Sequence, residues 1–305
     1  MHIAVLGNAG SWYVADLERA ATVRGDRCTR MDYRQLTARV LGQSADSTQN
    51  PKSKNQNPIS LVSPQGALDD CDAVLVRTMP PGSLEQVVFR MDALLTLESR
   101  GVVVVNPPRA VECAVDKYLC TSRLAAAGLP TPETIVCEDS DAALAAFAEL
   151  GGDVVVKPIF GSEGRGILRL TDPDLALRAF RTLERIDAVI YVQRFVEHEG
   201  FDVRVLVLDG CVLGGMKRSN SADFRTNVSR KARTETHPVT DREADLALRA
   251  TRCVGARFAG VDLLYDRRGG CHVIEVNAVP GWKAFQRTTG IDVAGELLNA
   301  LHCSV

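Results

Sequence analysis

Short, uninterrupted runs of apolar residues alternate with helical segments in the first third of this chain. His2–Leu6, Ala73–Val76 and Val102–Val105 are runs of this kind, and Trp12–Val23 between the first two has helical spacing. A strand buried on both faces has a continuous apolar sequence, which is typical of a parallel sheet covered by helices. Residues 1–107 are therefore predicted to form a small α/β domain.

One polar segment interrupts this alternation. Residues 42–66 (GQSADSTQNPKSKNQNPISLVSPQG) are rich in Ser, Asn, Gln and Pro. Most of such a segment cannot bury enough apolar area to offset the entropy lost on ordering. We predict a long surface loop, and the sequence leaves open whether it is a lid, a docking segment or an idle insertion.

The rest of the chain mixes helices with strands of both kinds. A helix is predicted over Val111–Ala127, because Gly128 and then Pro130 form a stop signal. From Asp202 onward the pattern indicates antiparallel strands, with a hairpin turn at Asp209-Gly210. The predicted organisation is α/β and α+β, with one subdomain over residues 108–188 and another over residues 189–305.

Charge and cysteine content exclude several functions. The 36 Lys and Arg residues nearly balance the 38 Asp and Glu residues, giving a net charge of −2, so no nucleic-acid partner is expected. The absence of a long apolar run predicts no membrane span. The nine cysteines are scattered without a CxxC pair, and the first residues lack a signal-peptide pattern. A cytoplasmic location with reduced thiols is expected.

A glycine-rich stretch follows the strand that ends at Lys157. Residues 161–166 read GSEGRG, and a loop of this kind can direct backbone N–H groups at phosphate oxygens. It matches neither the P-loop nor the dinucleotide-binding fingerprint. By itself it is about equally consistent with a plain turn.

Two carboxylates and an amide lie near the ends of two later predicted strands. Glu275 and Asn277 share a strand face, and Asp262 joins them if its strand pairs with theirs as a hairpin. These hard oxygen ligands suit Mg²⁺. Each acid alone is more often a solvated or salt-bridged side chain, so the hypothesis depends on the three together.

A set of basic residues lies between these motifs, at Arg204, Lys217, Arg218, Arg225 and 230–231. Arginine suits bidentate contact with carboxylate or phosphate. A solvated basic edge is an equal alternative.

The order of these motifs resembles the ATP-grasp superfamily and, within it, the RimK-type amino-acid ligases. The matching segments, over most of residues 110–300, are 116–117 (DK), 128–132 (GLPTP), 155–158 (VVKP), 161–166 (GSEGRG), 193–196 (QRFV), 202–204 (DVR), 223–227 (DFRTN), 260–262 (GVD), 275–281 (EVNAVPG) and 288–292 (TTGID). The resemblance implies an ATP-grasp fold preceded by a small pre-ATP-grasp domain. It also implies a carboxylate–amine ligase that forms an acyl phosphate from ATP.

The resemblance assigns roles by position. ATP would be bound by Lys117, Lys157, Gly161, Ser162, Glu163, Gly164, Gly166, Gln193, Arg194, Phe195, Val196 and Asp202, with residues 161–166 as a lid. Asp262, Glu275 and Asn277 would hold one or two Mg²⁺ ions, with Mn²⁺ as an alternative. Arg204, Arg225 and Asn227 would act at the transferred phosphate, and Arg230, Lys231, Trp282 and Lys283 would contact the acceptor.

Three departures bear on the substrate. Arg194 stands where an acidic residue is usual, and residues 229–232 (SRKA) replace a His-Arg-Gly-Gly stretch. Trp282 is either a core anchor or a stacking surface for a flat acceptor. The expected reaction adds L-glutamate to the carboxylate of a coenzyme, such as a tetrahydromethanopterin-type pterin, or of a small molecule. The alternatives are RimK-like glutamylation of a ribosomal-protein C-terminus, a LysX-like amino-group-carrier ligase and a noncatalytic nucleotide-binding protein. A homo-oligomer is expected by analogy.

Overall fold

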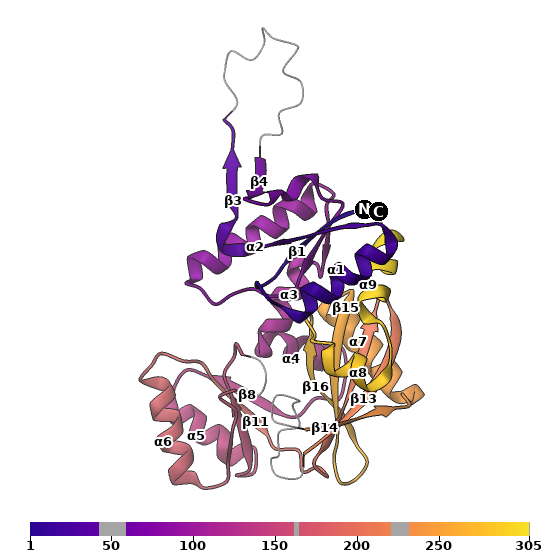
Figure 1. Ribbon diagram of the computed structural model, residues 1–305. Helices are drawn as coiled ribbons and strands as arrows, with labels where there is room; N and C mark the ends of the chain where they lie inside the picture. The colour runs from indigo at the N-terminus through magenta and orange to yellow at the C-terminus, as the bar shows by residue number, and fades with distance from the viewer. Residues whose placement is uncertain (43–58, 162–164, 221–231, 305) are drawn as a thin grey trace, which may run out of the picture. The chain divides into compact units, whose positions relative to one another are not determined.

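The computed structural model describes residues 1–42, 59–161, 165–220 and 232–304 (Figure 1). Two compact units are present, Met1–Pro108 with Asp292–Val305, and Arg109–Ile291. The sequence prediction assigned all of residues 189–305 to one subdomain, whereas the structure groups the last fourteen with the N-terminal unit. Each unit is described by itself.

The N-terminal unit is built on a parallel sheet with the strand order β2-β1-β6-β7. Its strands are β1 (His2–Leu6), β2 (Arg27–Met31), β6 (Ala73–Val76) and β7 (Val103–Val105), and its helices are α1 (Trp12–Arg24), α2 (Leu84–Ser99) and α9 (Val293–His302). Strands β1 and β6 are buried along almost their whole length. The continuous apolar runs thus form the centre of this sheet, as the α/β prediction required.

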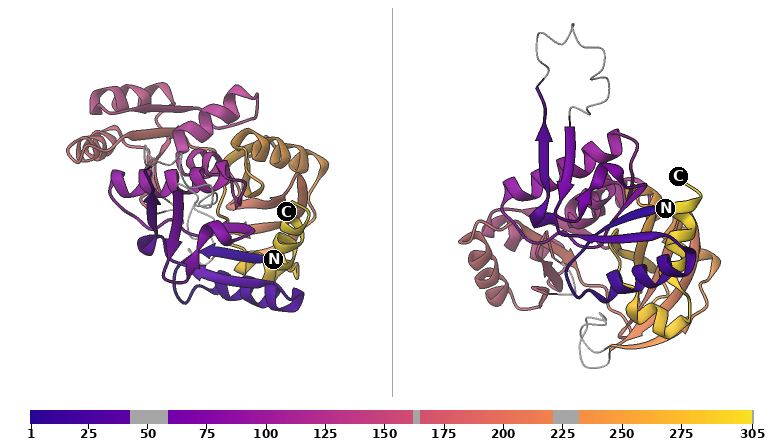
Figure 2. Two further views of the ribbon diagram at one scale, coloured as in Figure 1. Left: turned by 90° about the horizontal axis from the view of Figure 1, so that it is seen from above. Right: turned by 45° about the horizontal axis from the view of Figure 1, so that its top comes forward.

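Helix α9 belongs to this unit because its apolar face packs beside α1 (Figure 2). Leu297, Leu298 and Leu301 are buried. Polar contacts reinforce the packing, since His302 Nε2 lies 2.8 Å from the carboxylate of Asp26, just after α1. The last helix therefore completes a core that begins almost 300 residues earlier.

A small antiparallel sheet extends from the N-terminal unit. It contains β3 (Thr37–Val40), β4 (Ile59–Ser63) and β5 (Gly66–Ala67), and the short helices η1 (Tyr33–Gln35) and η3 (Leu68–Asp70) flank it. The loop prediction was wrong over β4, because Leu61 is buried and the strand pairs with β3. Residues 43–58 of the predicted insertion lie outside the described residues.

The second unit begins with two helices where one was predicted. Helix α3 covers Pro108–Val115 and α4 covers Lys117–Ala126. Asp116 between them has an extended backbone, and its carboxylate accepts a hydrogen bond of 2.9 Å from the N–H of Leu119. This N-cap divides the predicted single helix into two and makes Lys117 the first residue of α4.

The first sheet of this unit is antiparallel, with the order β10-β9-β11-β8. Its strands are β8 (Thr134–Cys137), β9 (Val154–Lys157), β10 (Leu168–Leu170) and β11 (Ile190–Arg194). Helices α5 (Ser140–Glu149) and α6 (Pro173–Glu184) pack together and bury Phe147 and Phe180 against it. Figure 1 shows both helices on one face of the sheet.

The second sheet of this unit has the order β14-β13-β12-β15-β16 and is antiparallel throughout. Its strands are β12 (Phe201–Leu208), β13 (Cys211–Ser219), β14 (Arg233–His237), β15 (Phe258–Tyr265) and β16 (Cys271–Asn277), and α7 (Asp241–Val254) and α8 (Lys283–Thr289) accompany them. The β12–β13 turn lies at Asp209-Gly210, both with positive φ, as predicted. A capping box between Thr240 and Glu243 starts α7, whose buried face packs on β12, β15 and β16.

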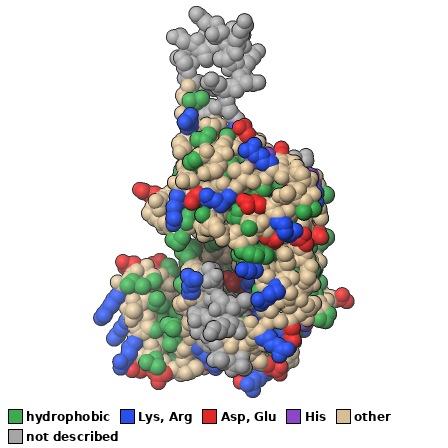
Figure 3. Space-filling model, in the orientation of Figure 1, with side chains coloured by type: hydrophobic (Ala, Val, Ile, Leu, Met, Phe, Trp, Pro, Cys, Tyr) green, Lys and Arg blue, Asp and Glu red, His purple; other side chains and the backbone are tan. Residues whose placement is uncertain are grey.

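Acidic and basic side chains are interspersed on the face of the N-terminal unit drawn in Figure 3. This mixture agrees with the near-balanced charge of the chain. Among the described residues, no helix combines the length and the apolar character that crossing a membrane requires.

Candidate active site

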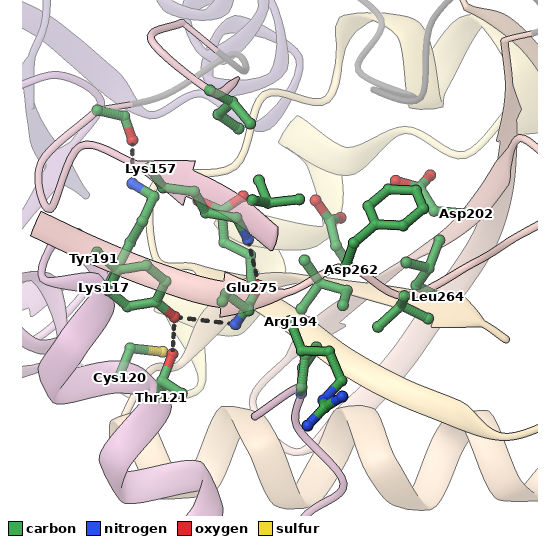
Figure 4. Close-up of a pocket in the computed structure, with 18 of the residues that line it drawn as sticks. Lys117, Cys120, Thr121, Lys157, Tyr191, Arg194, Asp202, Asp262, Leu264 and Glu275 are labelled. Carbon is green, nitrogen blue, oxygen red and sulfur yellow. Dashed lines mark hydrogen bonds between the residues drawn. The ribbon is translucent and has the colours of Figure 1, made fainter. Parts of the chain in front are cut away.

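A cavity in the second unit collects most of the described residues that the sequence singled out (Figure 4). The predicted residues that line it are Lys117, Lys157, Gly161, Gln193, Arg194, Phe195, Val196, Asp202, Asp262 and Glu275. They come from α4, from β9 and its following loop, from β11 and from the β12–β15–β16 sheet. Segments up to 158 residues apart in sequence thus meet around one space.

Two lysines carry positive charge into the cavity, which Arg165 and Arg194 also line. Lys157 is the last residue of β9 and Lys117 the first of α4, where its ammonium group donates a 2.8 Å hydrogen bond to the carbonyl of Gly161. Burial lowers the pKa of Lys157 to about 8, the charge of Lys117 adds to this effect, and Glu275 opposes it. Both cations are consequently held where a ligand with negative charge would relieve their repulsion.

A hydrogen-bond network fixes the direction of Lys157. Its Nζ donates to Gln193 Oε1 at 2.7 Å, while Gln193 Nε2 donates to the hydroxyl groups of Tyr191 and Thr134. Tyr191 in turn shares a 2.9 Å hydrogen bond with Thr121 (Figure 4). Sequence reasoning found Gln193 but missed Tyr191, Thr121 and Thr134. The alternation of Tyr191 and Gln193 on one face of β11 was the signal that could have found Tyr191.

Strand register places five charged side chains on one face of the sheet, in two neighbouring rows. Arg218 on β13 pairs with Asp202 on β12, and Arg204 on β12 pairs with Asp262 on β15, which itself pairs with Glu275 on β16. Directly opposed residues in antiparallel strands share a face. The predicted hairpin that brings Asp262 to Glu275 is therefore present.

Arg218 and Arg204 neutralise the two aspartates. Both carboxylate oxygens of Asp202 accept hydrogen bonds from Arg218, at 2.6 and 2.5 Å, and those of Asp262 accept two from Arg204, at 2.7 Å each. Arg218 also lies 3.0 Å from Asp262 and is 1% exposed. Burial alone would raise the pKa of Asp262, but the two guanidinium groups lower it to about 2. Sequence reasoning named Arg218 among the basic residues without assigning it to the site.

The carboxylates of Asp262 and Glu275 and the amide of Asn277 suit a hard cation. Glu275 accepts no hydrogen bond from the described residues, and Asn277 Oδ1 accepts one, from the N–H of Val279 at 2.8 Å. Asp262 Oδ1 receives a single hydrogen bond and keeps capacity for another ligand. No group of three His, Cys, Asp or Glu side chains suited to a metal occurs in the described part of the chain. A cation here would thus rely on two carboxylates, an amide and oxygens from a ligand, which is the pattern that Mg²⁺ accepts.

The hinge after β11 offers one backbone donor. The N–H groups of Arg194 and Phe195 bind the carbonyls of Glu133 and Asp153, at 2.8 and 3.0 Å, whereas the N–H of Val196 has no such partner among the described residues. The Arg194 side chain forms two hydrogen bonds to Glu133 Oε2. This pair occupies the position at which the sequence departs from the RimK pattern.

The remaining predicted residues divide into three groups. Trp282 is fully buried, with its ring 5.9 Å from that of Phe258, so the structure favours the core-anchor alternative over stacking on an acceptor. Gly166 has φ 72°, which favours glycine, and Lys283 is exposed at the start of α8. Ser162, Glu163, Gly164, Arg225, Asn227, Arg230 and Lys231 lie outside the described residues.

The arrangement separates charges along one cavity. Lysines on α4 and β9 face carboxylates on β15 and β16, so a polyphosphate could contact the lysines while a divalent cation bridges it to the carboxylates. Such an arrangement positions and neutralises charge and needs no nucleophilic side chain.

Comparison with known proteins gives relatives that cover most of the chain. A family model of the RimK-like ATP-grasp domain matches residues 114–301. The tetrahydromethanopterin:alpha-L-glutamate ligase of Methanosarcina acetivorans is 32% identical over 278 residues, covering 82% of this chain and 86% of that one. A probable alpha-L-glutamate ligase of Haemophilus influenzae is 30% identical over 234 residues, covering 76% of each chain.

Solved structures show the same fold over the whole chain. The ATP-grasp ligase PsnB complexed with a minimal precursor superposes with a TM-score of 0.76 at 25% identity, covering 100% of this chain and 99% of that one. The predictions of the fold, of an ATP-dependent ligase and of the family are thereby confirmed. The chain belongs to the RimK-like ATP-grasp family of ligases.

Proposed function

We propose that this protein adds L-glutamate to a carboxylate of a small, coenzyme-like acceptor, at the expense of ATP. The observation that carries the proposal is the cavity in which Lys117 and Lys157 face Asp262 and Glu275. The relative named as a tetrahydromethanopterin:alpha-L-glutamate ligase covers most of the chain and supports glutamate as the amine and a pterin-type coenzyme as the acceptor.

Each residue of the cavity would have a role that follows from its charge. Lys117 and Lys157 would bind the phosphates of ATP, and the network from Thr121 to Gln193 keeps Lys157 aimed at them. The N–H of Val196 is suited to an edge of the adenine ring. Asp202 is held rigid by Arg218 beside this position. The acceptor carboxylate would then attack the γ-phosphate, and the glutamate amine would displace phosphate from the resulting acyl phosphate.

Asp262, Glu275 and Asn277 are the residues that would hold Mg²⁺. When bound, the ion supplies charge neutralisation for the phosphates. The two arginines keep Asp262 ionised throughout the physiological pH range, because its pKa lies near 2. The ion count, one or two, remains a prediction.

The proposal is tested by ligation in fractionated cell extract. Purified protein, ATP, Mg²⁺ and isotope-labelled L-glutamate are mixed with extract separated by a size filter, and mass spectrometry follows the labelled product alongside ADP release. We expect a labelled glutamyl product in the small-molecule fraction. ADP release without incorporation of label into either fraction would contradict glutamate as the amine.

A matched pair of variants ties turnover to the cavity. Glu275→Gln removes a charge but keeps the shape, and we expect it to abolish ADP release while the protein stays folded. Glu149→Gln makes the same change at an exposed position of α5 and should leave turnover unchanged. Equal activity in both variants would show that Glu275 is not a metal ligand.

A peptide acceptor is the second candidate. It is favoured by the similarity to PsnB, whose structures contain precursor peptides. A labelled product in the large fraction would identify this class of acceptor. Because identity to the pterin ligase is higher than identity to PsnB, 32% against 25%, we rank the small acceptor above the peptide acceptor.

A further inference from the structure

A second cavity lies wholly within the N-terminal unit and shares no lining residue with the cavity of the second unit. It opens between the segment after β2 and the segment that leads from β6 into α2. Leu36, Pro81 and Phe89 give it apolar walls, and Tyr33 and Arg90 give it polar ones. We refer to it as the N-terminal cavity.

Arg90 is a buried cation without a carboxylate partner among the described residues. It lies on the second turn of α2 and is 4% exposed. Among the described residues its guanidinium makes one hydrogen bond, of 2.6 Å, from Nη1 to the carbonyl of Pro80. A buried charge is costly unless it is paired. A single neutral acceptor leaves most of the donor capacity of this guanidinium unused.

Tyr33 supplies a second unsatisfied donor at the same place. Tyr33 is 3% exposed, and its hydroxyl has no hydrogen-bond partner among the described residues. Tyr33 and Arg90 line the same cavity, and the charge of Arg90 opposes the rise that burial causes in the pKa of Tyr33. A buried hydroxyl without a partner is rare in native proteins and calls for an explanation.

The backbone beside Arg90 is shaped to hold it. A Cβ atom at Gly82 would lie 3.0 Å from Arg90 Nη1 and 2.7 Å from Gln86 Oε1. Gln86 is itself fixed by the capping box with Ser83 at the start of α2. A side chain at position 82 would therefore crowd Gln86 first and the guanidinium second.

The topology of the sheet favours a ligand at this position. In the parallel order β2-β1-β6-β7, the chain moves from β1 to one side through β2 and to the other through β6 and β7. The carboxyl ends of β2 and β6 flank that of β1, and both walls of the cavity follow those ends. In open α/β sheets, ligands bind outside the carboxyl ends of the strands where the order reverses.

We propose that the N-terminal cavity binds the oxyanion group, carboxylate or phosphate monoester, of a small molecule with an apolar body. The oxyanion accepts hydrogen bonds from the Arg90 guanidinium and the Tyr33 hydroxyl, and the apolar body lies against Leu36 and Phe89. This ligand satisfies both buried donors and neutralises the unpaired charge. The site goes beyond the proposed ligase function and does not depend on it.

The test uses 3-phenylpropionate and phenyl phosphate as probes, with neutral 3-phenylpropanamide as the matched control. Binding to the full-length protein is measured by calorimetry with the ligase site saturated by Mg²⁺ and ADP. We expect at least one anionic probe to bind and the amide to bind at least about tenfold more weakly. Whichever anion binds identifies the class of oxyanion.

Variants locate the binding. Arg90→Met should abolish it and Tyr33→Phe should weaken it several-fold, while Arg178→Met, at an exposed position of α6 in the second unit, should leave it unchanged. Retained folding of each variant is checked by circular dichroism, and Tyr33→Phe serves alone if Arg90→Met does not fold. Equal binding of anion and amide, no binding of either anion at millimolar concentration, or full binding by both cavity variants would overturn the proposal.

Discussion

Replacing Arg218 with methionine removes a charge that two aspartates share inside the second unit. Arg218 is 1% exposed and Asp202 is 7% exposed, and their two hydrogen bonds are 2.6 and 2.5 Å long. Asp262 retains Arg204 in the variant, whereas Asp202 loses the two hydrogen bonds that Arg218 donates to it. The loss therefore falls mainly on the buried carboxylate of Asp202.

The expected cost follows from burial. Removing one partner of a buried ion pair destabilises a protein by about 3–5 kcal/mol, because the remaining charge stays desolvated. The chain contains a control with the same bidentate geometry, since Arg257 donates two hydrogen bonds of 2.7 Å to Asp209. Those side chains are 24% and 35% exposed. We expect Arg257→Met to cost below about 1 kcal/mol.

Urea unfolding followed by circular dichroism and by tryptophan fluorescence measures both costs. The midpoint of the transition of the second unit should fall much further for Arg218→Met than for Arg257→Met, with unchanged slope. Adding Asp202→Asn to Arg218→Met should recover part of the lost stability, because it removes the buried negative charge that Arg218 no longer neutralises. Equal costs for the two arginine variants would refute the argument that burial, and not geometry, sets the value of the pair.

Two further predictions concern the lysine of the cavity and the buried tryptophan. Lys157 has a pKa near 8 without ligand, and bound phosphates would raise this pKa, so binding of Mg²⁺–ADP should weaken as the pH rises above 8. Calorimetry across this range should show proton uptake on binding, and Lys157→Arg should flatten the dependence of affinity on pH. A flat dependence for the unmodified protein would count against the phosphate role of Lys157. Trp282→Ala should cost about 3–5 kcal/mol in urea unfolding, because its ring is fully buried against Phe258. Trp12→Ala, at a half-buried position, should cost clearly less, and a reversed order would argue that Trp282 is not a core anchor.

Sequence could predict the elements whose burial is uniform. The apolar runs of β1, β6 and β9 identified central strands, and Asp209-Gly210 identified a hairpin. Edge strand β2 (Arg27–Met31) carries arginines and is only partly buried, so its pattern resembles a loop. The break at Asp116 was hidden because apolar spacing continues across it, although the aspartate itself is a usual N-cap.

The sequence could predict site residues that lie close together on one strand. It could not predict contacts between strands, because these depend on the register in which the strands pair. Glu275 and Asn277 share a strand face in any register, so their proximity could be stated from the sequence. Arg218 meets Asp202 only because β12 and β13 pair at one particular offset. A shift of one residue would send every side chain to the other face. The role of Arg218 therefore required the structure.

The position of α9 has a consequence for how the chain is made. During synthesis, the first 108 residues leave the ribosome well before residues 292–305 exist, and domains usually fold in that order. Here α1 lacks the leucine face of its partner helix until the whole second unit has been translated. The N-terminal unit thus begins to emerge before the second unit and is completed after it, and a variant that slows synthesis or folding of residues 109–291 prolongs the time during which the apolar surface of α1 is exposed.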